Sequence, residues 1–372
     1  MPEQRLTVVQ LLPALNAGGV ERSVLEIGRA LVAAGHRSIV ISGGGRLLDK
    51  LTAQGSEHIT LDIGRKSLAT LRHIGTLRRL FSKLRPDIVH ARSRLPAWLA
   101  RLALRGMRAP RPHFVTTVHG LNSPSFYSSI LTRGERVICV SNAVRDYVLK
   151  HYSRTDPTRL TVIPRGVDPE EFPFGYQPDE AWQRGFFMDF PQLEGGVLLT
   201  LPGRGTRLKG HADAIVLLAE LVARGFDAHL LLLGAREPGR EEYIAELEAL
   251  AAQRGVAARV AISVPRNDVR EIYAISTLVL QLSTQPEAFG RTVIEALALC
   301  RPVLGYAHGG VGELLAELYP EGRVPPGEAT RLVERAAELL RVSPAIAPLS
   351  RYRLADMQAA TLAVYDSLAG AR

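Results

Sequence analysis

The chain has 372 residues, of which 46% are hydrophobic and 22% are charged, and it carries a formal net charge of +9 at pH 7. This length allows two domains of ordinary size, and the composition excludes a disordered or fibrous chain. Two cysteines, Cys139 and Cys300, are too few for a disulfide framework or a cysteine metal site. The sequence shows neither a signal peptide nor an apolar run of the ~20 residues that a membrane span needs, which predicts a cytoplasmic protein.

The positive charge is concentrated in the first half. Residues 1–168 contain 26 Lys and Arg against 11 Asp and Glu, whereas residues 169–372 contain 20 against 26. A basic half joined to a mildly acidic one indicates an anionic partner for the first half. No nucleic-acid-binding motif accompanies the charge, so an anionic membrane surface or a phosphorylated, lipid-linked acceptor is the better candidate. The alternative is a general preference for arginine, since 41 of the 46 basic residues are Arg.

The first half alternates short β-branched runs with amphipathic helical patterns, which is typical of βα units around a parallel sheet. In such sheets ligands bind beyond the carboxyl ends of the strands, so the residues that follow each run are candidates for a site. The expected strands are Thr7–Leu12, Ser38–Ser42, Asp87–Ala91, Phe114–His119 and Arg136–Ser141.

Three places after these strands carry candidate site residues. A glycine pair that ends at Gly19 precedes a helix expected from about Val20, and it leaves the helix N-terminus open to a phosphate, although such a pair is often only a turn. Arg92 and Arg94 follow the third strand, where paired guanidinium groups suit phosphate or carboxylate recognition, or form a solvated helix start. His119 ends the fourth strand, which predicts an imidazole at the ligand edge of the sheet.

Between residues 71 and 85 lies a basic amphipathic pattern, expected to form a helix. It is either a core-packed helix with a solvated basic side or a membrane-binding surface. Its basic residues are Arg72, Arg78, Arg79, Lys83 and Arg85, and its apolar ones are Leu71, Ile74, Leu77, Leu80 and Phe81.

The second half begins with an irregular linker over residues 169–195 and then repeats the strand, loop and helix pattern. Its first strand, GVLLTLPG, leads into a loop with Arg204 and Lys209, followed by a helix expected from about His211. Two cations five residues apart on a loop can flank a diphosphate, whose charge must be stabilised as it leaves. Gly205, between them, is expected only to make the loop more flexible.

The segment PEAFGRTVIEA places Glu287 and Glu295 eight residues apart across a Phe-Gly step. Glu287 lies on a loop, and Glu295 lies about one turn into the following helix. The first N–H groups of that helix, at Phe289, Gly290 and Arg291, have no backbone partners. Carboxylates that accept hydrogen bonds from hydroxyls, next to N–H groups that favour an anion, fit a sugar nucleotide. The alternative is an ordinary acidic helix start with Glu287 near the N-cap.

Taken together, these segments resemble glycosyltransferase family 4. STQPEAFGRTVIEAL is similar to the E-x7-E signature of that family, and LNAGGVERS, PGRGTRLKGH and HGGVGELL follow the family's order along the chain. The resemblance implies the GT-B fold, in which two Rossmann-like domains face each other across a cleft. The N-terminal acceptor domain would span residues 1–170 and the donor domain residues 171–345, and the helix in residues 346–372 would cross back to the first domain.

The resemblance also implies the chemistry, which is retaining transfer from a nucleoside-diphosphate sugar to a glycan or lipid-linked acceptor, of the lipopolysaccharide or cell-surface polysaccharide type. No metal is expected, because the Asp-x-Asp of metal-dependent transferases is missing. Arg92 and Arg94 would face the acceptor. The residues that the resemblance places at the reaction are Glu287, His119, Arg204 and Lys209. Those that it places at the donor are Gly19, Arg204, Lys209, Glu287, Phe289, Gly290, Arg291 and Glu295.

Two other functions are compatible with parts of this pattern. A retaining glycosidase also uses two carboxylates, about 5 Å apart, but has no use for the two loop cations. A non-catalytic nucleotide-sugar-binding protein on the same fold is the remaining alternative, and the presence of both carboxylates and both cations disfavours it. Arg165, in VIPRGVD, replaces an asparagine that is commoner in the family, so the donor contact at this position stays open.

Overall fold

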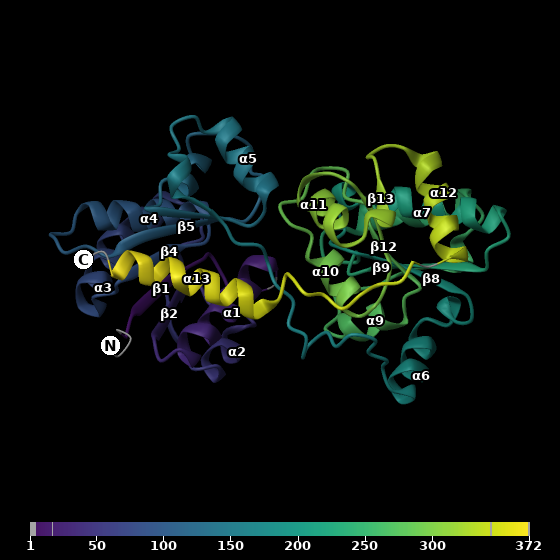
Figure 1. The fold of residues 1–372 in the computed structure, drawn as a ribbon, viewed down its shortest axis with the longest axis horizontal. Coiled ribbons are helices and arrows are strands. Elements are labelled where there is room, and N and C mark those ends of the chain that lie inside the picture. The colour runs from purple at the N-terminus through teal and green to yellow at the C-terminus, as the bar shows by residue number, and fades with distance from the viewer. Residues whose placement is uncertain (1–4, 17, 343, 371–372) are drawn as a thin grey trace. The chain divides into compact units, whose positions relative to one another are not determined.

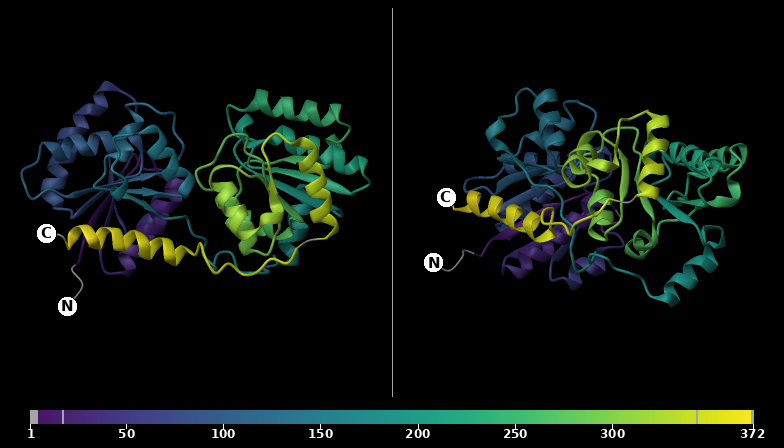
Figure 2. Two further views of the ribbon diagram at one scale, coloured as in Figure 1. Left: turned by 45° about the horizontal axis from the view of Figure 1, so that its top comes forward. Right: turned by 45° about the vertical axis from the view of Figure 1, so that its right-hand side comes forward.

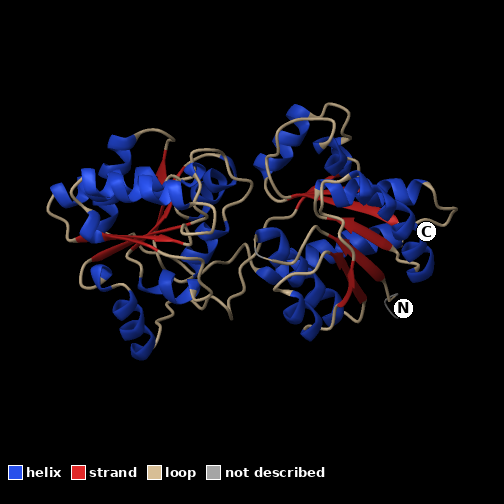
Figure 3. Cartoon of the chain, turned by 180° about the vertical axis from the view of Figure 1, so that it is seen from behind, coloured by secondary structure: helices blue, strands red, loops and turns tan. Residues whose placement is uncertain are grey.

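The structure, a computed structural model, describes residues 5–16, 18–342 and 344–370. The chain forms two compact units, unit 1 with Met1–Arg165 and Leu354–Arg372, and unit 2 with Gly166–Arg353. The sequence analysis placed the domain boundaries at residues 170 and 345, a few residues away from those of the structure. The segments around both boundaries have no periodic hydrophobic pattern, so the sequence does not show where one domain ends. Each unit contains one parallel sheet with helices on both faces (Figures 1 and 3), so the predicted α/β fold class is confirmed.

Unit 1 is built on a seven-stranded sheet with the order β3-β2-β1-β4-β5-β6-β7, and every neighbouring pair is parallel. The central strands β1, β4 and β5 are almost entirely buried and mostly apolar because helices cover both faces. The strands are Thr7–Leu11 (β1), Arg37–Ser42 (β2), Glu57–Thr60 (β3), Ile88–Ala91 (β4), His113–Val118 (β5), Arg136–Cys139 (β6) and Leu160–Val162 (β7). The helices are Gly19–Ala33 (α1), Leu48–Ala53 (α2), His73–Leu84 (α3), Arg94–Arg105 (α4), Asn142–His151 (α5) and Leu354–Ala369 (α13).

The five strands expected in this half are present, whereas no bounds were predicted for the two edge strands. β3 has the sequence EHIT, with no residue fully buried, and β7 has only three residues. Edge strands contact the sheet on one side only, so their sequences lack the apolar run that marks a central strand.

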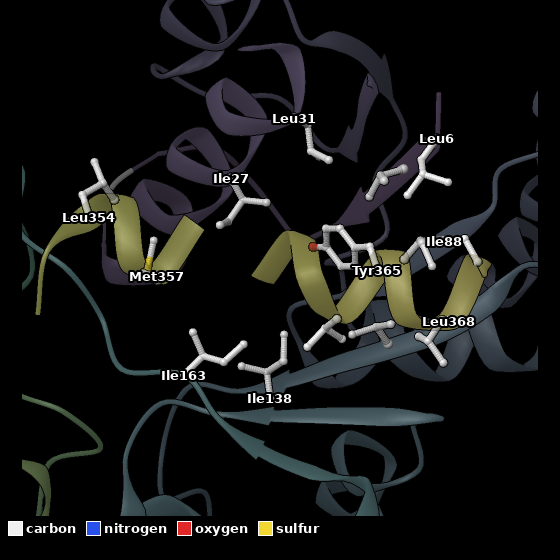
Figure 4. Packing of buried hydrophobic residues seen from close by; sticks show 14 residues of the cluster. Leu6, Ile27, Leu31, Ile88, Ile138, Ile163, Leu354, Met357, Tyr365 and Leu368 are labelled. Atoms are coloured by element: carbon white, nitrogen blue, oxygen red, sulfur yellow. The ribbon is translucent and has the colours of Figure 1, made fainter. Parts of the chain in front are cut away.

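The last helix, α13, completes the core of unit 1 although it lies at the other end of the chain. Figure 4 shows its apolar residues beside those of β1, α1 and the following strands. The hydroxyl of Tyr365, which is fully buried, forms a hydrogen bond with His90 Nδ1 at 2.7 Å. Each large apolar side chain buried here contributes on the order of 1.5–3 kcal/mol, so unit 1 depends on this distant segment. The labelled residues of the cluster are Leu6, Ile27, Leu31, Ile88, Ile138, Ile163, Leu354, Met357, Tyr365 and Leu368.

Unit 2 is built on a six-stranded sheet with the order β10-β9-β8-β11-β12-β13, again with parallel neighbours (Figure 2). Its strands are Val197–Pro202 (β8), Ala228–Leu233 (β9), Val260–Ile262 (β10), Leu278–Gln281 (β11), Val303–Tyr306 (β12) and Arg323–Val324 (β13). Its helices are Glu180–Asp189 (α6), His211–Ala223 (α7), Glu241–Gln253 (α8), Val269–Ile275 (α9), Arg291–Ala298 (α10), Gly309–Leu318 (α11) and Ala329–Arg341 (α12).

The segment of residues 169–195, expected as an irregular linker, contains helix α6. Asp179 caps this helix by accepting a hydrogen bond from the backbone N–H of Trp182 at 2.8 Å. Of its ten residues only Phe186 is buried. This helix is stabilised by its N-cap and by one buried side chain, and it has no apolar stripe. Its sequence therefore shows no helical period of hydrophobic residues.

The basic segment expected as a helix over residues 71–85 forms α3. Leu77 and Phe81 are fully buried, whereas Leu71 precedes the helix and is 49% exposed. The apolar side therefore packs against the rest of unit 1. The basic residues are exposed, although Arg78 also donates to the carbonyl oxygen of Ala103 in α4 at 3.4 Å. None of the helices in the described part of the chain is long and apolar enough to cross a membrane.

Candidate functional site

Both sheets have a point at which the strand order reverses. In unit 2 the chain runs from β8 outward to β9 and β10, and then returns to β11 on the other side of β8. In unit 1 the same reversal lies between β1 and β4. Loops at the carboxyl ends of such neighbouring strands diverge and leave room for a ligand. The predicted site residues of each unit follow these strands.

In unit 2, the loop after β8 carries the two predicted cations in different environments. Arg204 is exposed, and its guanidinium has no side-chain partner among the described residues. Lys209 donates to Glu287 Oε1 at 2.5 Å, and the two side chains are 27% and 23% exposed. A third cation, Arg207, pairs with Glu246 at 2.6 Å and lies away from this contact. The loop therefore presents one cation without a partner and one paired with the predicted catalytic carboxylate.

Gly205 has a stronger reason to be glycine than the flexibility that the sequence analysis assigned to it. A Cβ at this position would lie 2.2 Å from the carbonyl oxygen of Ala235. No rotation of a side chain relieves a clash with backbone. Gly205 therefore fixes the course of the loop close to the end of β9, and the expectation of added flexibility is wrong.

Glu287 lies on the loop after β11 and accepts three hydrogen bonds. The donors are Lys209 Nζ, Ser283 Oγ and Gln281 Nε2, the last at 3.4 Å. The N-cap of α10 is Gly290, and no side chain caps that helix. Glu287 is therefore not a helix cap, and the alternative of an ordinary acidic helix start is wrong. Its carboxylate is held toward the loop after β8.

The remaining residues of the signature build the start of α10. Gly290 has φ 105°, a left-handed conformation that favours glycine. The side chain of Phe289 is buried, so only its backbone is available to a ligand. Glu295 is buried one turn into the helix, where Arg291 Nε donates to its Oε1 at 3.4 Å. The backbone groups and the second carboxylate thus lie on the element where the sequence placed them.

Two glycines of the HGGVGELL segment allow backbone to approach the Glu287 loop. Gly309 has φ 56°, and a Cβ there would lie 2.5 Å from the carbonyl oxygen of Glu287. The N–H of Gly310 donates to that oxygen at 2.8 Å. His308, which the sequence analysis did not single out, makes a hydrogen bond through Nε2 with the carbonyl oxygen of Ser283 at 2.7 Å. The only signal for His308 was its place directly before the glycine pair.

Unit 1 contains a cavity of about 370 Å³ whose lining comes from residues 13–131. Arg94 begins α4 at its edge, where the guanidinium donates to Ser128 Oγ at 3.2 Å and lies over the ring of Tyr127. His119 and Gly120, after β5, also line it. The segment from residue 120 to 132, which follows β5, contains a short 3₁₀ turn over Ser128–Thr132 in which Ile130 is buried.

Arg92 differs from the prediction. Its guanidinium is 3% exposed and donates to Gln10 Oε1 at 2.5 Å and to Ser23 Oγ at 3.3 Å. The side chain points into unit 1 because Gln10 and Ser23 supply oxygen acceptors that solvent would otherwise supply. Arg92 and Arg94 therefore do not act as a pair of outward-facing guanidinium groups, and only Arg94 is placed to meet a ligand directly.

His119 is held by Arg165. The NH2 group of Arg165 lies 2.5 Å from His119 Nδ1, and its NH1 donates to Ser23 Oγ at 2.9 Å. Burial, together with the positive charges of Arg165 and Arg92, keeps the pKa of His119 well below its ordinary value. The imidazole is thus neutral. Because Arg can only donate, Nδ1 is the acceptor and Nε2 carries the proton.

The two glycines of the pair in unit 1, Gly18 and Gly19, have different structural roles. Gly18 is the N-cap of α1 and has φ 135°, a backbone conformation that favours glycine at this position. A Cβ at Gly19 would meet no atom of the described residues within 4 Å, so packing against them does not require glycine there. His90, by contrast, is fully buried, with hydrogen bonds to Tyr365 and Thr117 on its two ring nitrogens.

The residues that the structure describes contain no cluster of three or more His, Cys, Asp or Glu side chains able to hold a metal ion. The titratable groups near the predicted donor residues of unit 2 include His211, whose pKa burial lowers to about 4. The arrangement there is one of cations, carboxylates and helix N-termini, which can bind a diphosphate and hydroxyl groups.

Comparison with known proteins gives matches to both halves of the chain. Residues 17–171 match the family described as Glycosyltransferase Family 4, and residues 189–352 match Glycosyl transferases group 1. Among curated proteins, the 2-deoxystreptamine glucosyltransferase of Streptomyces kanamyceticus is 27% identical over 183 residues, which are 49% of this chain and 45% of that protein. The chain therefore aligns with about half the length of this relative.

Solved structures with the same fold cover nearly the whole chain. A glycosyltransferase from Rickettsia africae is 26% identical, with a TM-score of 0.86 and 98% of each chain covered. The Anabaena protein HepE, solved in complex with UDP-glucose, is 18% identical, with a TM-score of 0.80, and the match covers 98% of this chain and all of that one. Both matches confirm that the two sheets form a GT-B fold.

Proposed function

The chain belongs to glycosyltransferase family 4, and on that premise we propose that it transfers a sugar from a nucleoside-diphosphate sugar with retention of configuration. Unit 2 would bind the donor, and unit 1 would bind the acceptor. The UDP-glucose in the HepE complex supports UDP as the nucleotide to test first.

The observation that carries this proposal is the contact between Lys209 and Glu287. Lys209 follows β8 and Glu287 follows β11, so the reversal of strand order brings them together from positions 78 residues apart. The ammonium group and the unpaired guanidinium of Arg204 can stabilise the charge that develops on the leaving diphosphate. Glu287 can accept hydrogen bonds from hydroxyls of the transferred sugar, and we assign it to positioning that sugar. Glu295, buried in α10, is assigned to the ribose.

A screen of nucleotide-sugars for release of the nucleoside diphosphate tests the proposal. One donor should be hydrolysed slowly without an acceptor, and Arg204→Ala should reduce its rate by about 10² to 10³, the loss typical of one preorganised charge-stabilising group. Arg207→Ala is the matched control, because Arg207 lies on the same loop but pairs with Glu246. Tight binding of a nucleotide-sugar with neither hydrolysis nor transfer would favour the non-catalytic alternative instead.

The acceptor is proposed to be a glycan or lipid-linked molecule of the lipopolysaccharide or cell-surface polysaccharide type, met at an anionic membrane surface inside the cell. Support comes from the excess of basic residues in residues 1–168 and from the solvated basic side of α3. Because Leu77 and Phe81 pack into unit 1, attachment would be electrostatic, at about 1 kcal/mol for each basic residue near the surface.

Sedimentation with liposomes tests this attachment. Binding should appear with anionic vesicles, fade as salt rises, and weaken when the exposed Arg79 and Lys83 of α3 are both changed to Glu. The matched control changes Arg154 and Arg159, which lie outside α3, to Glu. Equal binding to neutral vesicles, or no binding to either kind, would contradict the electrostatic attachment.

A further inference from the structure

The cavity of unit 1 is lined by cations and has no acidic side chain in its lining. Lys66, Arg92 and Arg94 contribute to its wall, together with polar groups such as Ser93 and Asn122. Lys66 is exposed and has no side-chain partner among the residues that the structure describes. At about 370 Å³ the cavity has the size of a small-ligand site. Three positive side chains around one small volume favour an anion.

Two helices also begin at this cavity. α1 starts at Gly19 and α4 at Arg94, and their first turns contribute Val20 and Leu95 to the lining. The N-cap residues of the two helices, Gly18 and Ser93, make no side-chain cap hydrogen bond. The first turn of α4 has no acidic residue, so its dipole adds to the positive potential there. The first turn of α1 carries Glu21, whose carboxylate lies beside Gly18 and offsets the dipole of that helix, although Glu21 is not among the lining residues.

His119 supplies an independent sign of a ligand. The hydrogen bond from Arg165 leaves the proton of the neutral ring on Nε2. That Nε2 atom is buried and has no hydrogen-bond partner among the described residues, and the residue lines the cavity. Buried polar atoms in folded proteins are nearly always paired, so an unpaired donor at a cavity indicates a group that arrives with the ligand.

We propose that this cavity binds a phosphate group carried by the acceptor, so that the acceptor is a phosphorylated sugar or a glycan with a phosphate substituent. This inference rests on the proposed function and narrows its substrate class. Lys66 and Arg94 would bind the phosphate directly, and the positive charge of the buried Arg92 would attract the phosphate from the wall of the cavity. A phosphate of the donor offers the same chemistry, so the experiment must separate the two sources.

Titration calorimetry on the full chain, without donor, provides the first measurement. Glucose 6-phosphate should bind more tightly than glucose, which carries no charge, and the difference should shrink as salt rises. Lys66→Gln and Arg94→Gln should each weaken glucose 6-phosphate binding about tenfold, the loss that a missing charge-assisted hydrogen bond produces. The matched control is Arg105→Gln, an exposed arginine at the other end of α4, which should leave binding unchanged. Lys66→Gln is the decisive variant, because Lys66 is exposed and has no side-chain partner among the described residues, so the change should leave the fold intact.

The second measurement identifies the source of the phosphate. Lys209→Met, in unit 2, should weaken the binding of UDP and leave that of glucose 6-phosphate unchanged. The inference is overturned if glucose and glucose 6-phosphate bind equally, if Lys66→Gln has no effect, or if Lys209→Met abolishes glucose 6-phosphate binding, which would place the phosphate at the donor residues. Failure of donor hydrolysis in every nucleotide-sugar, with phosphate binding intact, would contradict the proposed function and leave this cavity assignment standing.

Discussion

Replacing Lys209 with Met separates the catalytic role of its charge from its role in the fold. The stem of Lys209 passes beside Gly203, where a Cβ would lie 3.0 Å from Lys209 Cγ. Methionine keeps most of that stem and removes only the ammonium. Glu287 then loses its bond to Lys209 Nζ but keeps those from Ser283 and Gln281. The carboxylate therefore stays in place, and the change tests the missing charge.

The two consequences differ in size. Lys209 and Glu287 are both about one quarter exposed, and a solvent-screened pair of this kind contributes about 1 kcal/mol or less to stability. Loss of a preorganised charge at a leaving diphosphate raises the reaction barrier by about 3–4 kcal/mol, or 10² to 10³ in rate. We therefore expect a nearly unchanged free energy of unfolding together with a large loss of turnover.

The assay compares turnover of the identified donor with unfolding in denaturant for wild type, Lys209→Met and Arg207→Met. Arg207 is the control because it lies on the same loop as Lys209, but its side chain is 71% exposed and pairs with Glu246 of α8. Turnover within threefold of wild type for a folded Lys209→Met would place the diphosphate elsewhere. A loss of several kcal/mol in stability would show that the pair holds the loop rather than the substrate.

Three further predictions follow from the same contacts. Glu295→Ala should weaken calorimetric binding of UDP, whereas Glu287→Ala should leave that affinity nearly unchanged and abolish transfer; equal losses would contradict the two assignments. Burial holds the pKa values of His90 and His119 well below that of an unfolded histidine, so the unfolded chain binds more protons and stability falls with falling pH. Between pH 6.5 and pH 5.5, each of the two histidines should lower the free energy of unfolding of unit 1, measured in denaturant, by about 1 kcal/mol. A free energy of unfolding that does not change over this pH range would refute the prediction. Tyr365→Phe removes the 2.7 Å bond to His90 and should cost unit 1 about 1–3 kcal/mol, because a buried nitrogen loses its partner; unchanged unfolding would show that another group satisfies it.

Much of this protein was readable from the sequence, because the informative signals are local. Strands such as β1 and β9 are short apolar runs that end in glycine or proline, and each is followed by a helical period. Lys209 and Glu287 were recognisable because each lies on the loop that follows such a run, where ligands of parallel sheets bind, and within a motif that resembles the family. The weaker elements were missed for the same reason, since the edge strand β3 and the helix α6 have no apolar pattern of their own.

What the sequence could not determine is which of these local features meet. Arg92 and Arg94 are two residues apart and were predicted to act as a pair. In the structure, the guanidinium of Arg92 donates hydrogen bonds to Gln10 and Ser23 in the interior of unit 1. Arg165 lies 46 residues from His119, and only the packing of the strands brings its guanidinium to the imidazole and so fixes which nitrogen carries the proton. Contacts of this kind depend on strand order and side-chain burial, which belong to the whole fold. The sequence by itself determined the chemical groups and the elements that carry them, and the tertiary structure alone decided their partners.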